Sequence, residues 1–261
     1  MTNARLIDTP MTRAAQRGLP VPHILLAVLF TIVICVPALA AMDTDDYRKP
    51  TQVEIEFDWL VTTTIDAAIP PRPNGWDVYA QTKPTQREWV PTGTGLQPFE
   101  VNYAVEWRDT QRKKKADAEM SLALLKATTK EMQREIRREM SPRDWNVTVE
   151  VRVNWFERWL DESAVELPSI GGARVFQKPA KIDAYSGDWV EARTYVFMGD
   201  GWRLDEHGPA EDRMIMQFAE RGDVPRTTVQ AIIIRVEAEA DRAQSILRSI
   251  DWNMLNSLLR R

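Results

Sequence analysis

The sequence contains one cysteine, Cys35, and two histidines, His23 and His207. A single cysteine excludes a disulfide framework within the chain and a zinc site built from several thiolates. His23 lies near the N-terminus, so the rest of the chain offers only His207. This excludes zinc sites with several histidines and the two-histidine iron site, and it leaves one candidate base for a serine hydrolase.

Motifs for common reactions are also missing. The chain has no glycine-rich phosphate loop, no Gly-x-Ser-x-Gly elbow, no His-Glu-x-x-His pair and no dinucleotide fingerprint. Each of these motifs supplies a geometry that scattered residues rarely replace. The sequence therefore predicts no catalytic residue and no cofactor-binding residue, and it favours a protein that is not an enzyme.

Residues 1–41 have the pattern of a secretory signal peptide. Three arginines precede an uncharged apolar stretch from Ile24 to Val36, and Pro37-Ala38-Leu39-Ala40 places small residues before a cleavage site after Ala40. Cleavage would remove Cys35, and the protein would be periplasmic or secreted. The alternative is an uncleaved N-terminal membrane anchor from Leu25 to Ala41, whose 17 residues are near the minimum that spans a bilayer. Membrane association is expected only in that case.

The charge balance argues against a nucleic-acid partner. Removal of residues 1–40 takes away three arginines and one aspartate and leaves 31 basic and 37 acidic residues, a net charge of −6. A nucleic-acid-binding protein needs a basic surface to neutralise phosphates. The expected partner is instead a protein or another envelope component.

Three segments alternate apolar and polar residues with a period of two, which is typical of half-buried strands. They are residues 53–61, 99–107 and 145–155. Further strands are predicted at 189–198, 213–218 and 228–238, and a hairpin around Lys83-Pro84. Apolar residues at helical spacing predict a long helix over 110–140 and a C-terminal helix from Ala240. Residues 42–261 are therefore expected to form a single α+β domain: an antiparallel sheet of long strands flanked by the long central helix and the C-terminal helix.

An acidic loop after the predicted strand at 189–198 is the best local candidate for a metal site. Its candidate ligands are Asp200, Asp205, His207 and Glu211. Hard cations such as Ca²⁺ bind several carboxylate oxygens. Trp202 and Leu204 occupy positions where a calcium loop needs oxygen ligands, so a solvated connector is the favoured interpretation.

All ten tryptophans lie after the signal segment. Buried indoles would supply stability that disulfides provide in other exported domains, and this is the expected role of most of them. The alternative is a stacking platform for sugars, which together with a pair of carboxylates would suit a carbohydrate-binding or glycoside-acting protein.

In the C-terminal half, Thr228-Val-Gln-Ala-Ile-Ile-Ile-Arg-Val runs into Ala240-Asp-Arg-Ala-Gln-Ser-Ile-Leu-Arg-Ser-Ile-Asp-Trp. The resemblance of these residues is to the closing strand–helix unit of the PsbP-like family, relatives of the extrinsic photosystem II protein that also occur as bacterial envelope proteins. It implies an antiparallel sheet with helices and a non-catalytic role in docking on, or assembling, a membrane complex. No site residue follows from it.

Three functions remain open from the sequence. The first is an exported, non-enzymatic binding or assembly protein that acts on a partner protein or envelope component. The second is a carbohydrate-binding or glycoside-acting protein, and the third is an anchored subunit of an envelope machine.

Overall fold

The computed structural model describes residues 47–82, 90–91, 98–161, 163–183, 189–205 and 213–260. The predicted signal peptide lies outside these residues, as do Lys83-Pro84 and residues 206–212. Within the described part of the chain, every helix is too short or too polar to span a bilayer.

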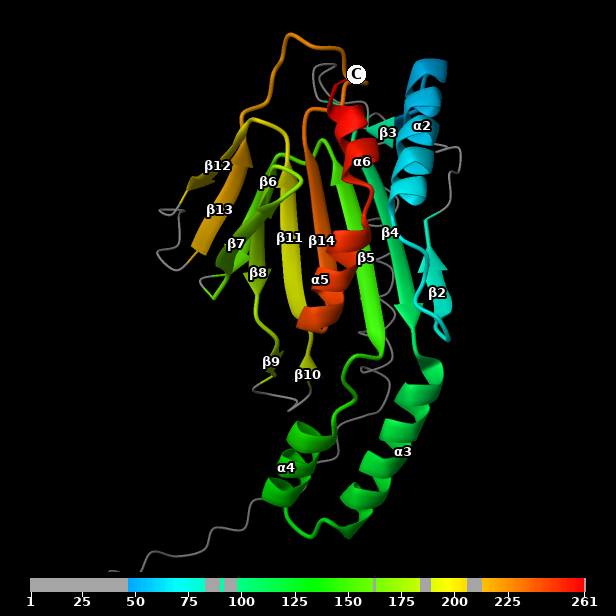
Figure 1. Cartoon of the computed structure of the whole chain (residues 1–261), viewed down its shortest axis with the longest axis vertical. Coiled ribbons are helices and arrows are strands. Elements are labelled where there is room, and N and C mark those ends of the chain that lie inside the picture. The colour runs from blue at the N-terminus through cyan, green and yellow to red at the C-terminus, as the bar shows by residue number, and fades with distance from the viewer. Residues whose placement is uncertain are drawn as a thin grey trace, which may run out of the picture. The chain divides into compact units, whose positions relative to one another are not determined.

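A seven-stranded antiparallel sheet forms the centre of the fold (Figure 1). Its spatial order is β2 (Asp77–Gln81), β4 (Val101–Arg108), β5 (Asn146–Val153), β14 (Ile232–Ala238), β11 (Ala192–Met198), β8 (Ala173–Lys178) and β7 (Val165–Ile170). The predicted α+β class and antiparallel sheet are therefore confirmed.

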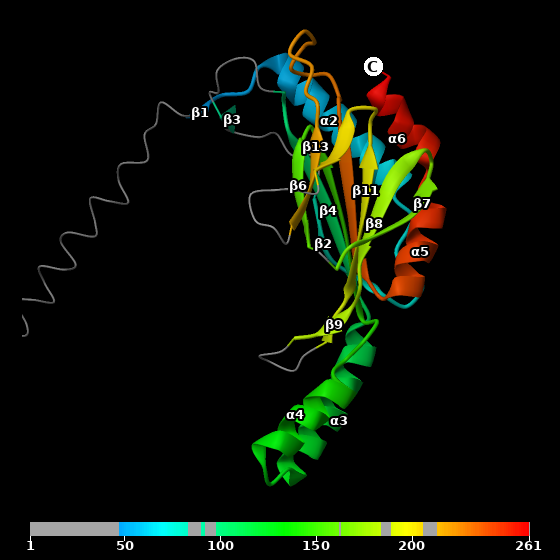
Figure 2. The same cartoon turned by 90° about the vertical axis from the view of Figure 1, so that its left-hand side faces the viewer.

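Helices cover one face of this sheet, and a smaller sheet packs on part of the other (Figures 1 and 2). The covering helices are α2 (Gln52–Ala68), α5 (Ala240–Ser249) and α6 (Trp252–Leu259). The smaller sheet has the order β12 (Trp202–Asp205), β13 (Arg213–Phe218) and β6 (Glu157–Asp161). Two further strand pairs join β1 (Tyr47–Arg48) to β3 (Val90–Pro91) and β9 (Lys181–Ile182) to β10 (Trp189–Val190).

The alternation of β4 and β5 explains the main core. Valines at alternate positions of β5 are fully buried against the helices, and the intervening residues face the other way. A second core lies between the small sheet and the central sheet, and it contains Phe176, Phe197 and Trp202. The central sheet is thus apolar on both faces only where the small sheet covers it.

The predicted strand at 53–61 is wrong, because these residues belong to α2. A capping box of Thr51 and Glu54 starts the helix. Phe57, Val61 and Ile65 then follow at intervals of four and are buried. The apolar residues at 53–61 also fit a period of two, but two of them, Val53 and Trp59, are 61% and 60% exposed. Residues on the apolar face of a half-buried strand would not be so exposed.

The region 110–140 is helical as predicted, but it is divided into α3 (Thr110–Lys126) and α4 (Lys130–Met140). Ala127 caps the end of α3, and the Thr129 hydroxyl accepts a hydrogen bond from the Met132 N–H at the start of α4. The C-terminal helix is similarly divided between α5 and α6, where the Asp251 side chain caps α6. The two helices α3 and α4 form a hairpin that extends beyond the end of the central sheet (Figures 1 and 2).

The expected hairpin around Lys83-Pro84 is not formed by the strands predicted for it. Strand β2 pairs with β4, and Val90 pairs with Arg48. Strands β7 and β8 meet at a tight turn of Gly171 and Gly172, both with positive φ.

Candidate functional site

The sequence-predicted metal ligands do not form one site in the described residues. Asp200 lies in the turn between β11 and β12, whereas Asp205 is the last residue of β12, about 10 Å of extended strand beyond Trp202. His207 and Glu211 lie outside the described residues. Among the residues that the structure describes, no group of three or more His, Cys, Asp or Glu side chains could hold a metal ion.

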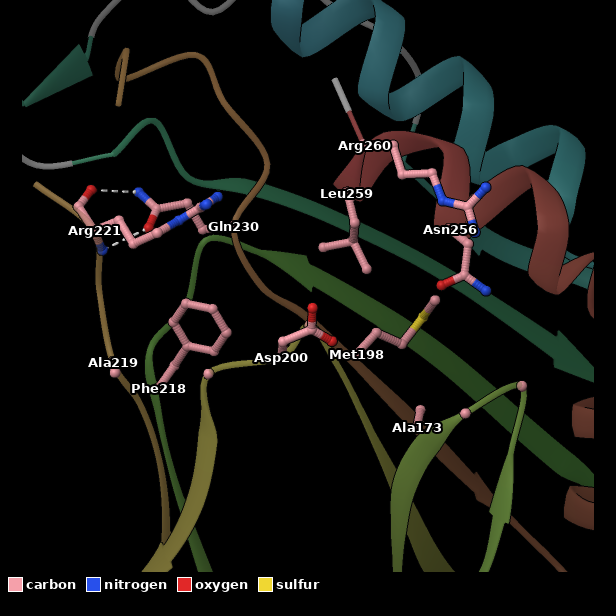
Figure 3. A pocket seen from close by; sticks show the side chains of 14 residues that line it. Ala173, Met198, Asp200, Phe218, Ala219, Arg221, Gln230, Asn256, Leu259 and Arg260 are labelled. Carbon is pink, nitrogen blue, oxygen red and sulfur yellow. Dashed lines mark hydrogen bonds between the residues drawn. The ribbon is translucent and has the colours of Figure 1, made fainter. Parts of the chain in front are cut away.

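Asp200 instead lines a pocket at the end of the central sheet, where β8 begins, β11 ends and the C-terminal end of α6 passes (Figure 3). Its volume is about 600 Å³, within the range of small-molecule sites. Its lining residues are Gly171, Gly172, Ala173, Met198, Gly199, Asp200, Gly201, Phe218, Ala219, Arg221, Gln230, Asn256, Leu259 and Arg260.

Two glycines that line this pocket leave no room for a Cβ atom. Gly199 has φ +113°, and a Cβ there would lie 2.7 Å from the Gln230 carbonyl oxygen. A Cβ on Gly201 would lie 2.8 Å from the Phe218 ring. Any larger residue at 199 would be strained and would clash with backbone, so the β11–β12 turn can close only with glycine.

The described lining of the pocket contains charged groups but neither a hydroxyl or thiol nucleophile nor a pair of carboxylates. Asp200, Arg221 and Arg260 are exposed at its rim, and the buried Gln230 side chain is hydrogen-bonded to the main chain of Arg221. The lining residues include no Ser, Thr, Cys, Tyr or His and a single carboxylate. A glycosidase needs two opposed carboxylates, and a covalent mechanism needs a nucleophile. The charged and amide groups of the described lining could bind a polar group.

The α3–α4 hairpin is the second candidate. None of its 28 helical residues is buried, although it contains several leucines and methionines. Leu122, Leu125 and Met132 are 61%, 83% and 46% exposed. The two helices together carry nine basic and five acidic residues, on a chain whose net charge is −4. The hairpin is therefore a basic, partly apolar arm on an acidic protein.

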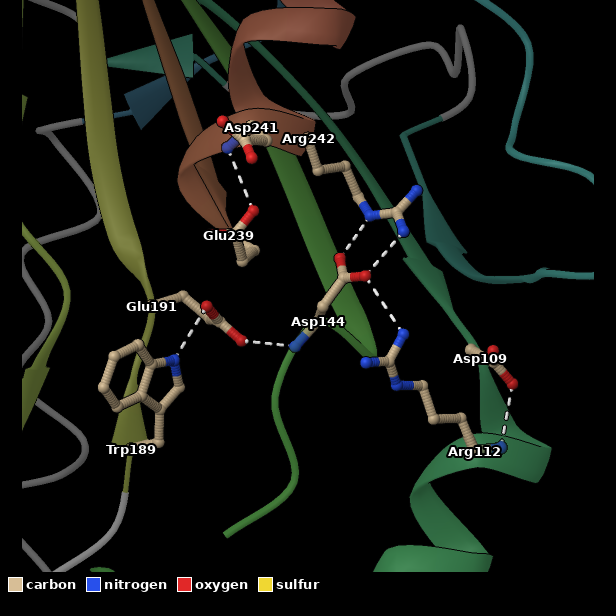
Figure 4. A network of polar contacts seen from close by, with 8 residues as sticks. All are labelled: Asp109, Arg112, Asp144, Trp189, Glu191, Glu239, Asp241 and Arg242. Carbon is tan, nitrogen blue, oxygen red and sulfur yellow. Dashed lines mark hydrogen bonds and ion pairs between the residues drawn. The ribbon is translucent and has the colours of Figure 1, made fainter. Parts of the chain in front are cut away.

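A polar network fastens the base of this arm to the sheet domain (Figure 4). The Asp144 carboxylate accepts hydrogen bonds from Arg112 of α3 at 3.1 Å and from the Nη2 and Nε atoms of Arg242 of α5, the former at 2.6 Å. The Asp144 N–H donates to Glu191, which also accepts from the Trp189 indole at 3.0 Å. The hydrogen bond with Asp144 raises the pKa of Arg242. One carboxylate thus joins the first turn of the arm to a covering helix.

Asp144 also has φ +49°, a left-handed conformation that Asp and Asn tolerate better than other side chains. The variant Asp144→Asn keeps this backbone preference and removes the charge. We expect it to lower the free energy of unfolding by about 1.5 kcal/mol, because the charge-assisted hydrogen bonds from Arg112 and Arg242 are weakened. We also expect faster amide hydrogen exchange in the first turns of α3. Glu119→Gln, on the exposed face of α3, is the control and should change neither quantity; an unaltered exchange rate in Asp144→Asn would contradict the fastening role.

The tryptophans divide between core and surface. The expected core role is confirmed for Trp76, Trp107 and Trp202, which are at most 9% exposed. It is wrong for Trp59, Trp155 and Trp159, which are 60%, 38% and 41% exposed. Trp59 belongs to α2, on the helical side of the sheet, whereas the other two lie at or near β6 on the opposite side. These three therefore do not make one stacking platform.

Comparison with known proteins adds no assignment: no protein-family model, curated protein or solved structure matches this chain. Function must therefore be argued from the pocket, the arm and the surfaces themselves.

Proposed function

We propose that this chain is an exported, non-enzymatic binding or assembly protein that docks on a partner protein of the cell envelope through the α3–α4 hairpin. The observation that carries the proposal is an arm of 28 helical residues that buries none of them and exposes leucines. Export and envelope location rest on the signal-peptide pattern of residues 1–41.

The arm has two apolar stripes, and its own packing accounts for only one. Half-buried residues of α3 such as Met120 and Leu124 share a helix face, as do Ile136 and Met140 of α4. On the outer side of α3, Ala118, Leu122 and Leu125 are all exposed. Their spacing of i, i+4 and i+7 is the anchor pattern of a helix that binds in an apolar groove.

The charges indicate what surrounds that groove. The outer stripe is flanked by exposed Lys114, Lys115 and Lys126, while residues 121–130 at the tip contain no acidic side chain. Positive groups next to an apolar stripe favour a partner whose apolar groove has an acidic rim, because complementary charges steer association and suppress wrong partners.

Strand addition at a sheet edge is a weaker route to the partner. The edge strand β7 contains Pro168, which has no N–H to donate, and its register is interrupted between Leu167 and Ile170. The other edge strand, β2, has five residues and a register shift between Val78 and Ala80. Short and irregular edges disfavour pairing with another chain, which leaves the arm as the better docking element.

The proposal is tested with a photo-crosslinking amino acid at position 125 in the native cells. We expect one discrete protein adduct from position 125 and none from position 165 on β7, where Val165 is 60% exposed. The crosslinked protein is then purified and its affinity measured directly. Leu125→Glu should weaken binding at least about 30-fold, as for loss of an interface hot spot, and Val165→Glu should leave it unchanged.

Two results would overturn the proposal. One is equal affinity of the purified partner for the wild type and for Leu125→Glu. The other is adducts with lipid alone, together with flotation of the wild-type chain, but not of Leu125→Glu, on phosphatidylglycerol vesicles. That outcome would make the arm a membrane-binding element.

A further inference from the structure

A cluster of arginines lies on the face of the central sheet that the helices do not cover. Glu150 and Arg152 alternate with the buried valines of β5 and therefore point to this face, as does Arg235, which is opposite Glu150 on β14. Arg158 reaches the same place from β6, and Tyr195 from β11. Strands β5, β6 and β14 thus bring three guanidinium groups together, and β11 adds the Tyr195 hydroxyl.

Among the carboxylates in the described part of the chain, only that of Glu150 pairs with these three cations. Arg152 donates to Glu150 Oε1 at 2.7 Å. The Arg235 Nε atom lies 3.1 Å from Glu150 Oε2, but at an angle that makes no hydrogen bond. Arg158 donates from Nη2 to the Tyr195 hydroxyl at 3.0 Å. With the Glu150 side chain only 9% exposed, the cluster holds a net charge of +2 in partly buried surroundings.

Two donors of this cluster are buried and make no hydrogen bond: the Nε–H groups of Arg158 and Arg235. A buried donor without an acceptor costs about 1–3 kcal/mol, more when the group is charged, and such groups are rare unless a water or ion satisfies them. Both arginines line one small cavity of about 10 Å³, together with Glu150, Arg152, Tyr195 and Ile233. That volume holds about one water-sized ligand.

We infer that this cavity is a binding site for a single small anion: a halide, or one oxygen of an oxyanion such as phosphate or a carboxylate. The ligand would accept hydrogen bonds from the Nε–H groups of Arg158 and Arg235 and would offset the excess positive charge. A water could satisfy the same donors, but it would leave the charge uncompensated, which is costly away from bulk solvent. The site is distinct from the arm and does not depend on the proposed docking function.

Sodium bromide is the first probe, because bromide is identified by its anomalous scattering. Crystals of the wild-type chain grown with bromide should show an anomalous peak between the guanidinium groups of Arg158 and Arg235. In solution, thermal unfolding is followed at constant ionic strength while chloride, phosphate or acetate is varied separately. A saturable rise in Tm with chloride alone assigns the site to a halide, and a rise with phosphate or acetate assigns it to an oxyanion.

Three variants separate anion binding from a general effect of salt. Arg158→Gln should weaken the affinity about 10- to 100-fold, through loss of a charged donor. Arg193→Gln is the matched control, because Arg193 lies on the same sheet face and pairs one-to-one with Glu237 at 2.9 Å; its affinity should stay within about two-fold. Glu150→Gln removes the competing carboxylate and should tighten binding about 10-fold, a gain that a purely structural role of Glu150 would not produce.

The inference is overturned if the bromide crystals show no anomalous peak at the cluster and neither phosphate nor acetate gives a saturable rise in Tm. It is equally overturned if every anion raises Tm by the same amount, or if Arg158→Gln and Arg193→Gln respond alike. The crystal measurement uses the unaltered chain, so it stands even if a variant fails to fold.

Discussion

Replacement of Asn154 by alanine is expected to lower the free energy of unfolding by about 4 kcal/mol, the largest effect that we expect from a single polar residue of this fold. Asn154 is 1% exposed and follows β5 in a left-handed conformation with φ +58°. Its Nδ2 donates to the carbonyls of Phe99 and Thr228 at 3.1 and 2.9 Å, and its Oδ1 accepts from the Gln230 N–H at 2.8 Å. Alanine would remove all three hydrogen bonds from a largely buried position and would add backbone strain.

Thermal or urea unfolding would check this prediction, with an expected fall in Tm of about 10 °C for a domain of this size. Asn154→Gly separates the two causes, since glycine removes the hydrogen bonds but tolerates the backbone; it should recover about 1 kcal/mol relative to alanine. Asn102→Ala, at an exposed position of β4, is the control and should change stability by less than about 0.5 kcal/mol. If the Asn154 and Asn102 variants were equally stable, the Asn154 side chain would not hold the end of β5 to Phe99 and to residues 228–230.

Acid is expected to remove about 3 kcal/mol of stability through one residue, Glu54. Glu54 is 4% exposed, and its carboxylate accepts hydrogen bonds from Arg48 at 2.6 and 2.8 Å and from the Thr51 N–H at 2.8 Å. Arg48 is the main cause that lowers the pKa of Glu54 from 4.5 to about 2; burial opposes the shift, and Thr51 adds to it. Because the folded-state pKa is the lower one, this stabilisation is complete above about pH 5 and is lost as the pH falls towards 2.

Glu54→Gln tests the contribution directly. At pH 7 the variant should be less stable than the wild type by about 3 kcal/mol, and the difference should shrink as both are titrated below pH 5 in urea unfolding experiments. Glu166→Gln is the matched control: the pKa of Glu166 is also lowered, by Arg174, but the side chain is 46% exposed, so solvent screens the pair and little stability should change. A difference between wild type and Glu54→Gln that stayed constant from pH 7 to pH 3 would contradict the prediction.

Some elements could be predicted from the sequence because one residue face is buried and the other is not. The alternation of β4 and β5 reflects this directly. The predicted span Arg213–Phe218 of β13 is also correct, although its neighbouring residues Ile215 and Met216 are both buried. The alternation from 145 to 155 nevertheless predicts a strand that is too long, because Asn154 leaves the extended conformation and its side chain bonds to two other segments, at Phe99 and at residues 228–230. The period of two at 53–61 fails because the Thr51–Glu54 capping box and the buried i, i+4 residues outweigh it.

The candidate sites were less predictable, because each combines residues that are distant in sequence and that only the fold brings together. Of the pocket residues, the sequence singled out only Asp200, and for a metal site; Arg221 and Arg260 meet it through the sheet end and α6. In the arginine cluster, Arg235 faces Glu150 only because β14 inserts beside β5. The sequence does contain one indication of the exposed arm. The basic run Arg112-Lys113-Lys114-Lys115 lies near the N-terminus of α3, where the helix dipole disfavours positive charge.

The position of β14 has a consequence for how the protein is made. This strand lies between β5 and β11, at the middle of the sheet, yet it occupies residues 232–238. At about 5–20 residues per second, a ribosome takes roughly 10 to 40 s to add the chain from β1 to β14. During that time the sheet lacks its central strand, and α6 is not yet present to pack on α2. Folding of such a high-contact-order sheet must therefore follow synthesis, so the nascent chain remains accessible to chaperones that bind only unfolded polypeptides.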